Sequence, residues 1–285
     1  MMVWKNSEFI EVADGLTVAQ IHHGLSLFET FAIRSGVVEC LDSHWQRLAL
    51  GCERLGINPS GLHLGHFSKT THWSSVLQRL LKAASLSDAI VRLVVVPKSN
   101  GTFDEWVSVR PLPATPAKLD LFLLSTVRDD AEWMPRPKSG PWQNSAEAWR
   151  ELQSITPRPD TEGIQLDKQG HLSEATRSSI IWRENHRWFT PAATTQRLPG
   201  TTALQFSDYL RQSGQTMEEV AQPFPLQAES LIVLRSTFLG GAVLASRCQT
   251  PQGDLIWQAQ ADQGDAQRSL RGFAHWRAQR SLKLL

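Results

Sequence analysis

The sequence predicts an α+β fold in two lobes, and three observations lead to this prediction. Segments with the alternating pattern of strands and segments with helical spacing are mixed, without the strict β-α-β order of a parallel sheet. A Pro-rich passage from Pro111 to Pro116 interrupts them and is the best candidate for a linker. A chain of 285 residues is long enough for two modest cores. We therefore expect an N-terminal lobe over 1–112, a linker over 113–117 and a C-terminal lobe over 118–285.

In the N-terminal lobe, the alternating segments 27–33 and 37–41 flank a Gly-containing turn, which is typical of a hairpin. A helix is expected next, because Asp42 or Ser43 can cap it and apolar residues then recur at helical spacing. Gly56 is suited to end that helix. The other elements expected in this lobe are a helix over 73–84 and strands over 90–97 and 106–113.

The C-terminal lobe is expected to begin with a strand and to alternate between helices and β segments. Two β-rich segments turn at Glu184-Asn185, and an amphipathic helix begins after Gly200 and stops at Gly214. The remaining expected elements are a strand over 118–126, a helix over 144–155, a β segment over 231–237 and a basic amphipathic helix near the C-terminus.

Composition excludes several classes of protein. The 29 Lys and Arg residues balance 28 Asp and Glu residues, so the sequence does not indicate an extended nucleic-acid or membrane surface. Cys40, Cys52 and Cys248 lie too far apart for a C-x-x-C metal site, and no ligand cluster follows the pair His22-His23. The sequence lacks an apolar signal core and a long apolar run, so we expect a reduced, cytoplasmic protein without a metal ion.

One stretch indicates a particular chemistry. Gly200-Thr201-Thr202 precedes a helix, and a helix N-terminus offers unpaired N–H groups to a phosphate, although the same residues also serve as an ordinary N-cap. Glu174 lies upstream in a β-rich segment, where it is either a solvated residue or an acid that pairs with a heteroaromatic nitrogen. Pyridoxal phosphate needs such an acid, a phosphate site and a lysine that forms a Schiff base.

The C-terminal half offers few lysines for that role. Lys168 lies in the turn D-K-Q-G and Lys283 lies in the C-terminal tail. Lys138 lies in the rigid loop P-R-P-K-S-G-P, directly before an expected helix. Lys138 is therefore the best candidate for the Schiff-base lysine.

Two motifs carry a resemblance to a known family. L-S-E-A-T-R-S-S-I-I and W-F-T-P followed six residues later by L-P-G-T-T resemble the class IV, fold-type IV pyridoxal-phosphate enzymes. This family includes branched-chain and D-amino-acid aminotransferases and 4-amino-4-deoxychorismate lyases. The resemblance covers nearly the whole chain, and it implies a homodimer that binds pyridoxal 5'-phosphate and a small amine or amino-acid substrate between a small N-terminal and a larger C-terminal lobe.

The resemblance also implies individual roles. Lys138 would form the Schiff base and act as the general base, and Glu174 would keep the pyridine nitrogen protonated. The other four residues would bind the phosphate: Arg47 in the motif H-x-x-R-L, Thr201 and Thr202 at the helix start, and Thr237 in L-R-S-T-F-L-G-G.

Thr30 is either an ordinary strand residue or, by the resemblance, a residue that favours the lyases over the aminotransferases of this family. Alternation places Phe28, Thr30 and Ala32 on one strand face, and the resemblance sets that face against the cofactor. The corresponding residue is typically Gly in branched-chain aminotransferases, Val in D-amino-acid aminotransferases and Thr in the lyases. The sequence therefore favours a lyase that acts on 4-amino-4-deoxychorismate, with a class IV aminotransferase as the alternative.

Two departures from the family pattern leave a third reading open. Ser179 stands where the family usually has Asn, and Pro141, Trp142 and Gln143 follow the lysine where Asn or Tyr is usual. A scaffold that has lost its chemistry and binds a partner is therefore a third, less favoured reading. Arg92 and Arg110, on neighbouring β segments, either contact a substrate carboxylate or are solvated.

Overall fold

The computed structural model describes residues 2–11, 26–38, 41–62, 70–97, 103–128, 137–140, 143–235, 241–260 and 263–283. The chain divides into two compact units. Unit 1 comprises Met1–Pro113, Pro137–Pro141 and Ala278–Leu285, and unit 2 comprises Ala114–Arg136 and Trp142–Arg277. The segment that carries Lys138 thus groups with unit 1, whereas the sequence-based division placed it in the C-terminal lobe.

Unit 1 is built on an antiparallel sheet with the strand order β16-β4-β3-β5-β6-β1-β2. The hairpin of β3 and β4 and the long strands β5 and β6 occur where the alternating sequence predicts them. The strands are β1 (Met2–Lys5), β2 (Glu8–Glu11), β3 (Leu27–Arg34), β4 (Val37–Val38), β5 (Ala89–Pro97), β6 (Phe103–Pro111) and β16 (Leu282–Lys283).

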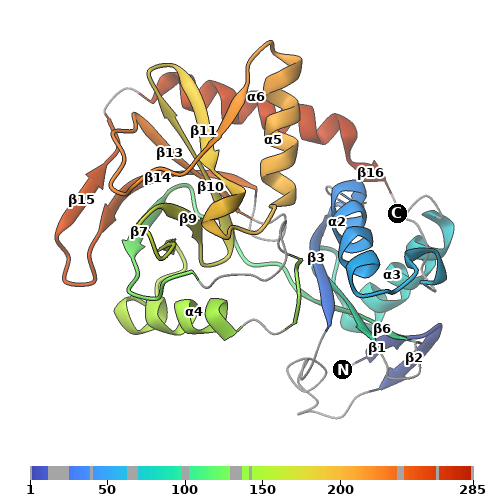
Figure 1. Ribbon diagram of the computed structural model, residues 1–285. Coiled ribbons are helices and arrows are strands. Elements are labelled where there is room, and N and C mark those ends of the chain that lie inside the picture. Colours follow the sequence, from blue (N-terminus) through green and yellow to red (C-terminus); the bar gives the residue numbers. More distant parts are fainter. Residues whose placement is uncertain are drawn as a thin grey trace. The chain divides into compact units, whose positions relative to one another are not determined.

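Two helices, α2 (Leu41–Arg54) and α3 (Thr70–Ala84), pack on one face of this sheet (Figure 1). Their apolar side chains share a core with the odd-numbered residues of β3, such as Leu27 and Phe31. Gly56 follows α2 and adopts φ +68°, a conformation that side-chain-bearing residues rarely adopt, so it ends the helix as expected. A short 3-10 helix, η1 (Pro59–Gly61), lies between α2 and α3.

Unit 2 contains a larger mixed sheet whose strands follow the path β12-β11-β10-β13-β14-β7-β8-β9, with β15 beside β14. The last strand of this path, β9, also packs against β10, so the sheet curls around its own core. The strands are β7 (Leu119–Leu123), β8 (Thr161–Leu166), β9 (Leu172–Ala175), β10 (Ser178–Glu184), β11 (Arg187–Pro191), β12 (Met217–Val220), β13 (Ser230–Arg235), β14 (Ala242–Gln249) and β15 (Leu255–Gln258).

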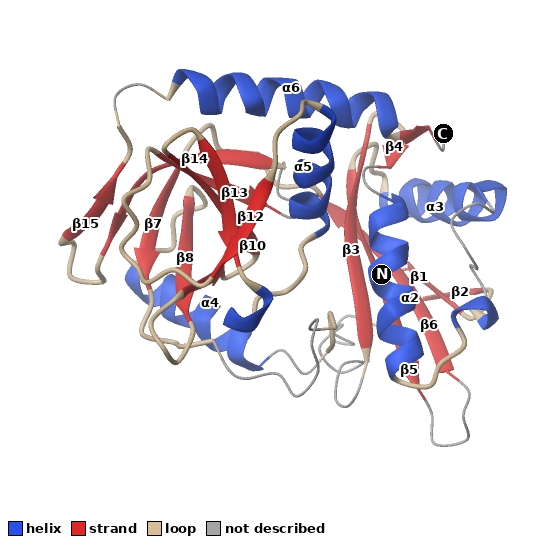
Figure 2. Cartoon of the chain, turned by 45° about the horizontal axis from the view of Figure 1, so that its top comes forward, coloured by secondary structure: helices blue, strands red, loops and turns tan. Residues whose placement is uncertain are grey.

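Helices cover the outside of the curled sheet (Figure 2). Side chains of α5 (Thr201–Gln212) and α6 (Gly264–Arg280) form a second core with Ile181 and Ile232, while α4 (Gln143–Ile155) packs against β8. A 3-10 helix, η2 (Ala193–Thr195), precedes α5. The helices expected over 73–84, 144–155 and 201–212 are confirmed. The turn expected at Glu184-Asn185 lies one residue later, at Asn185-His186, because Glu184 is the last residue of β10 and pairs with Arg187.

The described residues were compared with the patterns of a membrane-spanning helix and of a metal site. No helix among them is long and apolar enough to cross a membrane. Within the same residues, no group of three or more His, Cys, Asp and Glu side chains has the arrangement of a metal site. The pair His22-His23 and Cys40 lie outside the described residues.

Candidate active site

Lys138 is held against strand β3 by backbone hydrogen bonds. The amide of Phe28 donates to the carbonyl oxygen of Lys138 at 3.0 Å, and the amide of Gly140 donates to that of Ser26 at 2.6 Å. A β-bridge between Leu27 and Ser139 completes this pairing. The Lys138 ammonium nitrogen lies 4.9 Å from the centroid of the Phe28 ring. The pairing places the lysine beside the strand that carries Thr30, which explains why its segment belongs to unit 1.

The face of the unit 1 sheet that carries Phe28 also carries Thr30 and Arg92. Thr30 is buried, and the register of β3 and β5 makes it the direct neighbour of Arg92. The Arg92 guanidinium carbon lies 4.1 Å from the centroid of the Phe28 ring. Burial, aided by repulsion from Arg110, lowers the pKa of Arg92 to about 10. An amine, a hydroxyl and a partly buried guanidinium therefore share one region of the sheet.

Glu174 lies on β9 in unit 2 and is only 8% exposed. One carboxylate oxygen is 2.8 Å from Nη2 of Arg128, and the other accepts a hydrogen bond from the amide of Leu198 at 3.0 Å. Arg128 is itself buried and donates from Nη1 to Asn144 and Ser145, both at 2.9 Å. Glu174 is thus a buried member of an ion pair rather than a solvated strand residue.

The start of α5 has the properties of an anion site. Thr201 and Thr202 are both 2% exposed, and Gly200 at the N-cap makes no side-chain cap. The first N–H groups of a helix have no partner inside the helix, so these amides can bind a phosphate. A side chain at position 200 would come within 2.1 Å of the Ser179 hydroxyl, so only glycine allows this close approach.

The hydroxyl of Thr202 is engaged within unit 2. The Thr202 hydroxyl donates to the carbonyl oxygen of Arg235 at 3.1 Å, so its backbone amide is the group that it can offer to an anion. Thr237, the other phosphate contact expected from the sequence, lies outside the described residues.

Arg47 lies on α2 and forms a two-pronged ion pair inside unit 1. Its Nε and Nη2 donate to the two carboxylate oxygens of Glu29, at 2.7 Å and 2.6 Å. The resemblance assigns the Arg47 guanidinium to phosphate binding. In the structure, two of its nitrogens bond instead to a carboxylate of the same chain. The phosphate role of Arg47 stays a prediction.

Arg47→Ala is expected to weaken the affinity for pyridoxal phosphate by about one to two powers of ten. The reason is that a charge-assisted hydrogen bond to phosphate contributes roughly 1.5–3 kcal/mol. Titration of protein freed of cofactor gives the dissociation constant, and Gln46→Ala, an exposed position on the same helix, is the control. An unchanged dissociation constant in Arg47→Ala would contradict the phosphate role.

Sequence reasoning missed two partners, Arg128 and Glu29. No motif marks Arg128, which follows β7 and meets Glu174 only in the folded unit. A signal for Glu29 exists, since His44 and Arg47 lie one helical turn apart and therefore present their side chains on the same face of α2. Two basic side chains on one face of a buried helix indicate that an acidic side chain lies opposite them.

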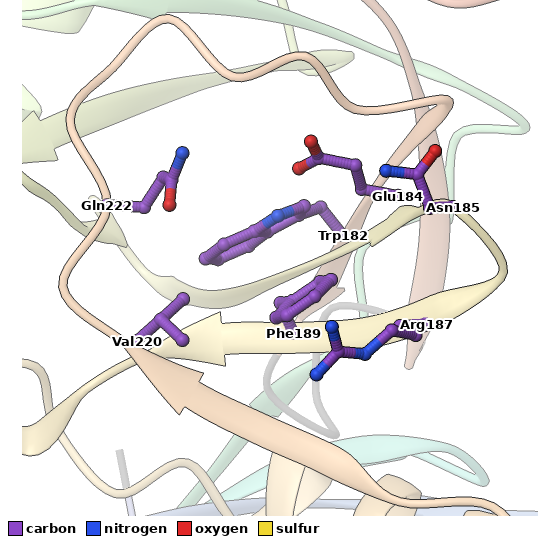
Figure 3. A pocket seen from close by; sticks show the side chains of 7 residues that line it. All are labelled: Trp182, Glu184, Asn185, Arg187, Phe189, Val220 and Gln222. Carbon is purple, nitrogen blue, oxygen red and sulfur yellow. The ribbon is translucent and has the colours of Figure 1, made fainter.

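The cavity shown in Figure 3 is a separate feature of unit 2. It has a volume of about 210 Å³, and the indole of Trp182 stacks on the ring of Phe189 within it. None of the candidate site residues lines it, so we do not assign it to the active site. Its lining consists of Trp182, Glu184, Asn185, Arg187, Phe189, Val220 and Gln222.

Comparisons with known proteins identify the family. The model of the class IV aminotransferase family matches residues 26–244, so the chain belongs to this family. An aminodeoxychorismate lyase of Bacillus subtilis (strain 168) is 27% identical over 218 residues, which span 70% of this chain and 71% of that protein. The chain is thus a class IV, pyridoxal-phosphate-dependent enzyme, and this level of comparison is compatible with a lyase or an aminotransferase.

Solved structures show the same fold. The branched-chain amino acid aminotransferase of Escherichia coli is 18% identical with a TM-score of 0.75, and the match covers 97% of this chain and 94% of that one. A putative 4-amino-4-deoxychorismate lyase from Legionella pneumophila is 16% identical with a TM-score of 0.74, covering 93% and 97%. The predicted fold-type IV architecture, with its small N-terminal and larger curled sheet, is confirmed.

The described residues have the chemistry that pyridoxal phosphate requires. Lys138 supplies a primary amine, Glu174 a buried carboxylate, and the uncapped start of α5 a set of amide donors beside the close approach at Gly200. When bound, pyridoxal phosphate supplies an electron sink for the electron pair that is released at the substrate carbon. The assignment of these residues to the cofactor stays a prediction, which the substitutions below test.

Proposed function

We propose that this enzyme is a lyase that converts 4-amino-4-deoxychorismate into 4-aminobenzoate and pyruvate. The observation that carries the proposal is the position of Thr30, a buried hydroxyl on the same strand that pairs with the Lys138 segment. The similarity to the lyase of Bacillus subtilis supports it. The proposal includes a homodimer in the cytoplasm, and it requires Glu174 and the start of α5 to contact the same cofactor as Lys138.

The reaction needs one proton removed and one proton delivered. The amine of Lys138 takes the proton from the amine-bearing carbon of the substrate. Loss of enolpyruvate then leaves the aromatic ring of 4-aminobenzoate. The Thr30 hydroxyl donates a proton to the methylene carbon of the departing enolpyruvate, which becomes pyruvate, and regains a proton from Lys138. One proton is thus removed from the substrate and one is delivered to the departing enolpyruvate. An aminotransferase releases no enolpyruvate, so it does not need this proton donor.

Arg92 supports a substrate with more than one carboxylate. Its Nε is buried and has no hydrogen-bond partner among the residues that the structure describes, and a second cation, Arg110, lies close enough to repel it. A guanidinium in this position is stabilised by an anion. 4-Amino-4-deoxychorismate carries two carboxylates, whereas a branched-chain amino acid carries one, so the charge of this sheet face favours the former.

Thr30→Val is expected to lower the rate of 4-aminobenzoate formation at least about tenfold while the cofactor stays bound. Valine keeps the shape of threonine but removes the hydroxyl that donates the proton, and a positioned proton donor contributes about a hundredfold or more. The measurement is the release of 4-aminobenzoate from 4-amino-4-deoxychorismate at saturating cofactor.

Thr30→Ser is the matched control, because it retains the hydroxyl on the same strand position. It should keep most of the activity. An undiminished rate in Thr30→Val would remove the proton-donor role. Robust amino exchange between amino acids and 2-oxo acids by the wild type, without release of 4-aminobenzoate, would identify an aminotransferase instead.

A further inference from the structure

Polar side chains are buried at one end of the curled sheet of unit 2, on the face that carries its apolar core. Arg235, the last residue of β13, lies directly opposite Ser178, the first residue of β10. Both continue the alternation that places Val233 and Ile180 in this core. Arg235 is 2% exposed and Ser178 is 6% exposed. A guanidinium and a hydroxyl are thus buried on neighbouring strands.

The buried carboxylate of Glu162, on β8, already has partners of its own. One of its oxygens accepts hydrogen bonds from the Thr176 hydroxyl and, at 3.0 Å, from the Arg177 amide. The other oxygen lies 3.6 Å from Nη2 of Arg177 and forms an ion pair with it. The carboxylate and the Arg177 guanidinium balance each other, so the charge of Arg235 is in excess.

The Arg235 guanidinium lies close enough to interact with both of these charges. Burial lowers the pKa of Arg235, the attraction of Glu162 opposes this effect, and the repulsion by Arg177 adds to it. We call Glu162, Arg177, Ser178 and Arg235 the Arg235 cluster. Two guanidinium groups and one carboxylate leave this cluster with one uncompensated positive charge.

The Arg235 cluster also has more hydrogen-bond donors than acceptors. In the described part of the chain, four buried donors have no partner: Nε and Nη1 of Arg235, Nε of Arg177 and the Ser178 hydroxyl. Oε2 of Glu162 is a buried acceptor without a hydrogen bond. A buried donor without an acceptor destabilises a protein, and a charged donor does so most strongly. A water molecule would accept such hydrogen bonds but would leave the excess charge uncompensated.

We propose that the Arg235 cluster binds one small monovalent anion, a halide or a small carboxylate, which accepts hydrogen bonds from Arg235 and Ser178. A single negative charge neutralises the cluster, whereas a phosphate dianion would leave a buried negative charge. Arg177, whose side chain is 24% exposed, connects the cluster to solvent. The site is separate from the start of α5, because the next residues along the two strands, Ser179 and Leu234, face that helix instead.

The test measures the binding of chloride and formate to the full-length protein saturated with pyridoxal phosphate, so that the cofactor occupies its own phosphate site. Broadening of the chloride NMR line reports chloride binding, and reversal of the broadening by formate reports the carboxylate. The melting temperature should rise with chloride concentration when sulfate keeps the ionic strength constant. No substrate is needed, so the test does not depend on the proposed function.

Arg235→Met is expected to lower the affinity for chloride at least about a hundredfold, because it removes the excess charge and its donors. Ser178→Ala keeps every charge and removes one donor, so the affinity should fall about tenfold. This second variant keeps the test decisive if Arg235→Met does not fold. Arg247→Met is the matched control, since Arg247 lies on β14 of the same sheet but is 45% exposed and pairs with Asp120 at 2.9 Å. It should bind chloride as the wild type does.

Three results would overturn the proposal. The first is a wild type that binds neither chloride nor formate, which would leave the cluster to water. The second is wild-type chloride affinity in folded Arg235→Met or in Ser178→Ala, which would place the anion elsewhere. The third is tighter binding of inorganic phosphate than of chloride and formate, which would contradict a monovalent ligand.

Discussion

Lys138→Ala is expected to abolish turnover, by more than about a thousandfold, and to abolish covalent attachment of the cofactor. The side chain supplies both the amine that binds the cofactor and the base that moves the proton. The fold should remain intact, because the hydrogen bonds between this segment and β3 use backbone atoms of Ser26, Phe28, Lys138 and Gly140. Borohydride reduction followed by peptide mass analysis locates the modified residue.

Lys168→Ala is the control for this experiment, since Lys168 lies in the turn between β8 and β9. It should retain activity and the adduct. If Lys138→Ala still carries a borohydride-stable cofactor on a folded chain, another lysine is the attachment site and the assignment of Lys138 is wrong.

Glu174→Gln is expected to lower the rate by a factor on the order of a hundred or more, which corresponds to several kcal/mol of transition-state stabilisation. Glutamine preserves the bulk and can still accept the hydrogen bond from the Leu198 amide. It removes the negative charge that would hold the pyridine nitrogen protonated, so the cofactor becomes a poor electron sink. The measurement is kcat at saturating cofactor.

Glu218→Gln provides a matched control, because Glu218 pairs with Arg187 at the surface of unit 2. The rate of this variant should equal that of the wild type. Near-normal turnover in Glu174→Gln would mean that the acid serves only the ion pair with Arg128.

The sequence predicts the local elements well because each depends on neighbouring residues. The spacing of Trp45, Leu48 and Cys52 predicts α2, and the glycines at 56 and 214 end their helices with positive φ. The hairpin turn is equally local and lies one residue later than predicted: Asn185 and His186 both adopt positive φ, as a two-residue hairpin turn requires.

The partners of the candidate site residues depend on tertiary structure and could not be predicted in the same way. Arg128 meets Glu174, and Glu29 meets Arg47, only after distant segments pack together. The spacing of His44 and Arg47 indicates that an acid faces them, but no spacing in the sequence identifies Glu29 or Arg128 as the partner. The assignment of Lys138 to the C-terminal lobe followed its order in the chain. Its bonds to β3 join residues that are far apart in sequence, which is why the structure groups it with unit 1.

The discontinuity of unit 1 has a consequence for folding. Its sheet includes β16, which pairs with β4 through Leu282 and Val38, and its β3 edge is bonded to the Lys138 segment. Contacts between such distant residues slow folding, because a long loop must close before they form. During synthesis, the Lys138 segment follows the first 113 residues after only a short part of unit 2, but β16 emerges after all of unit 2, so unit 1 reaches its complete form last although its sequence begins first.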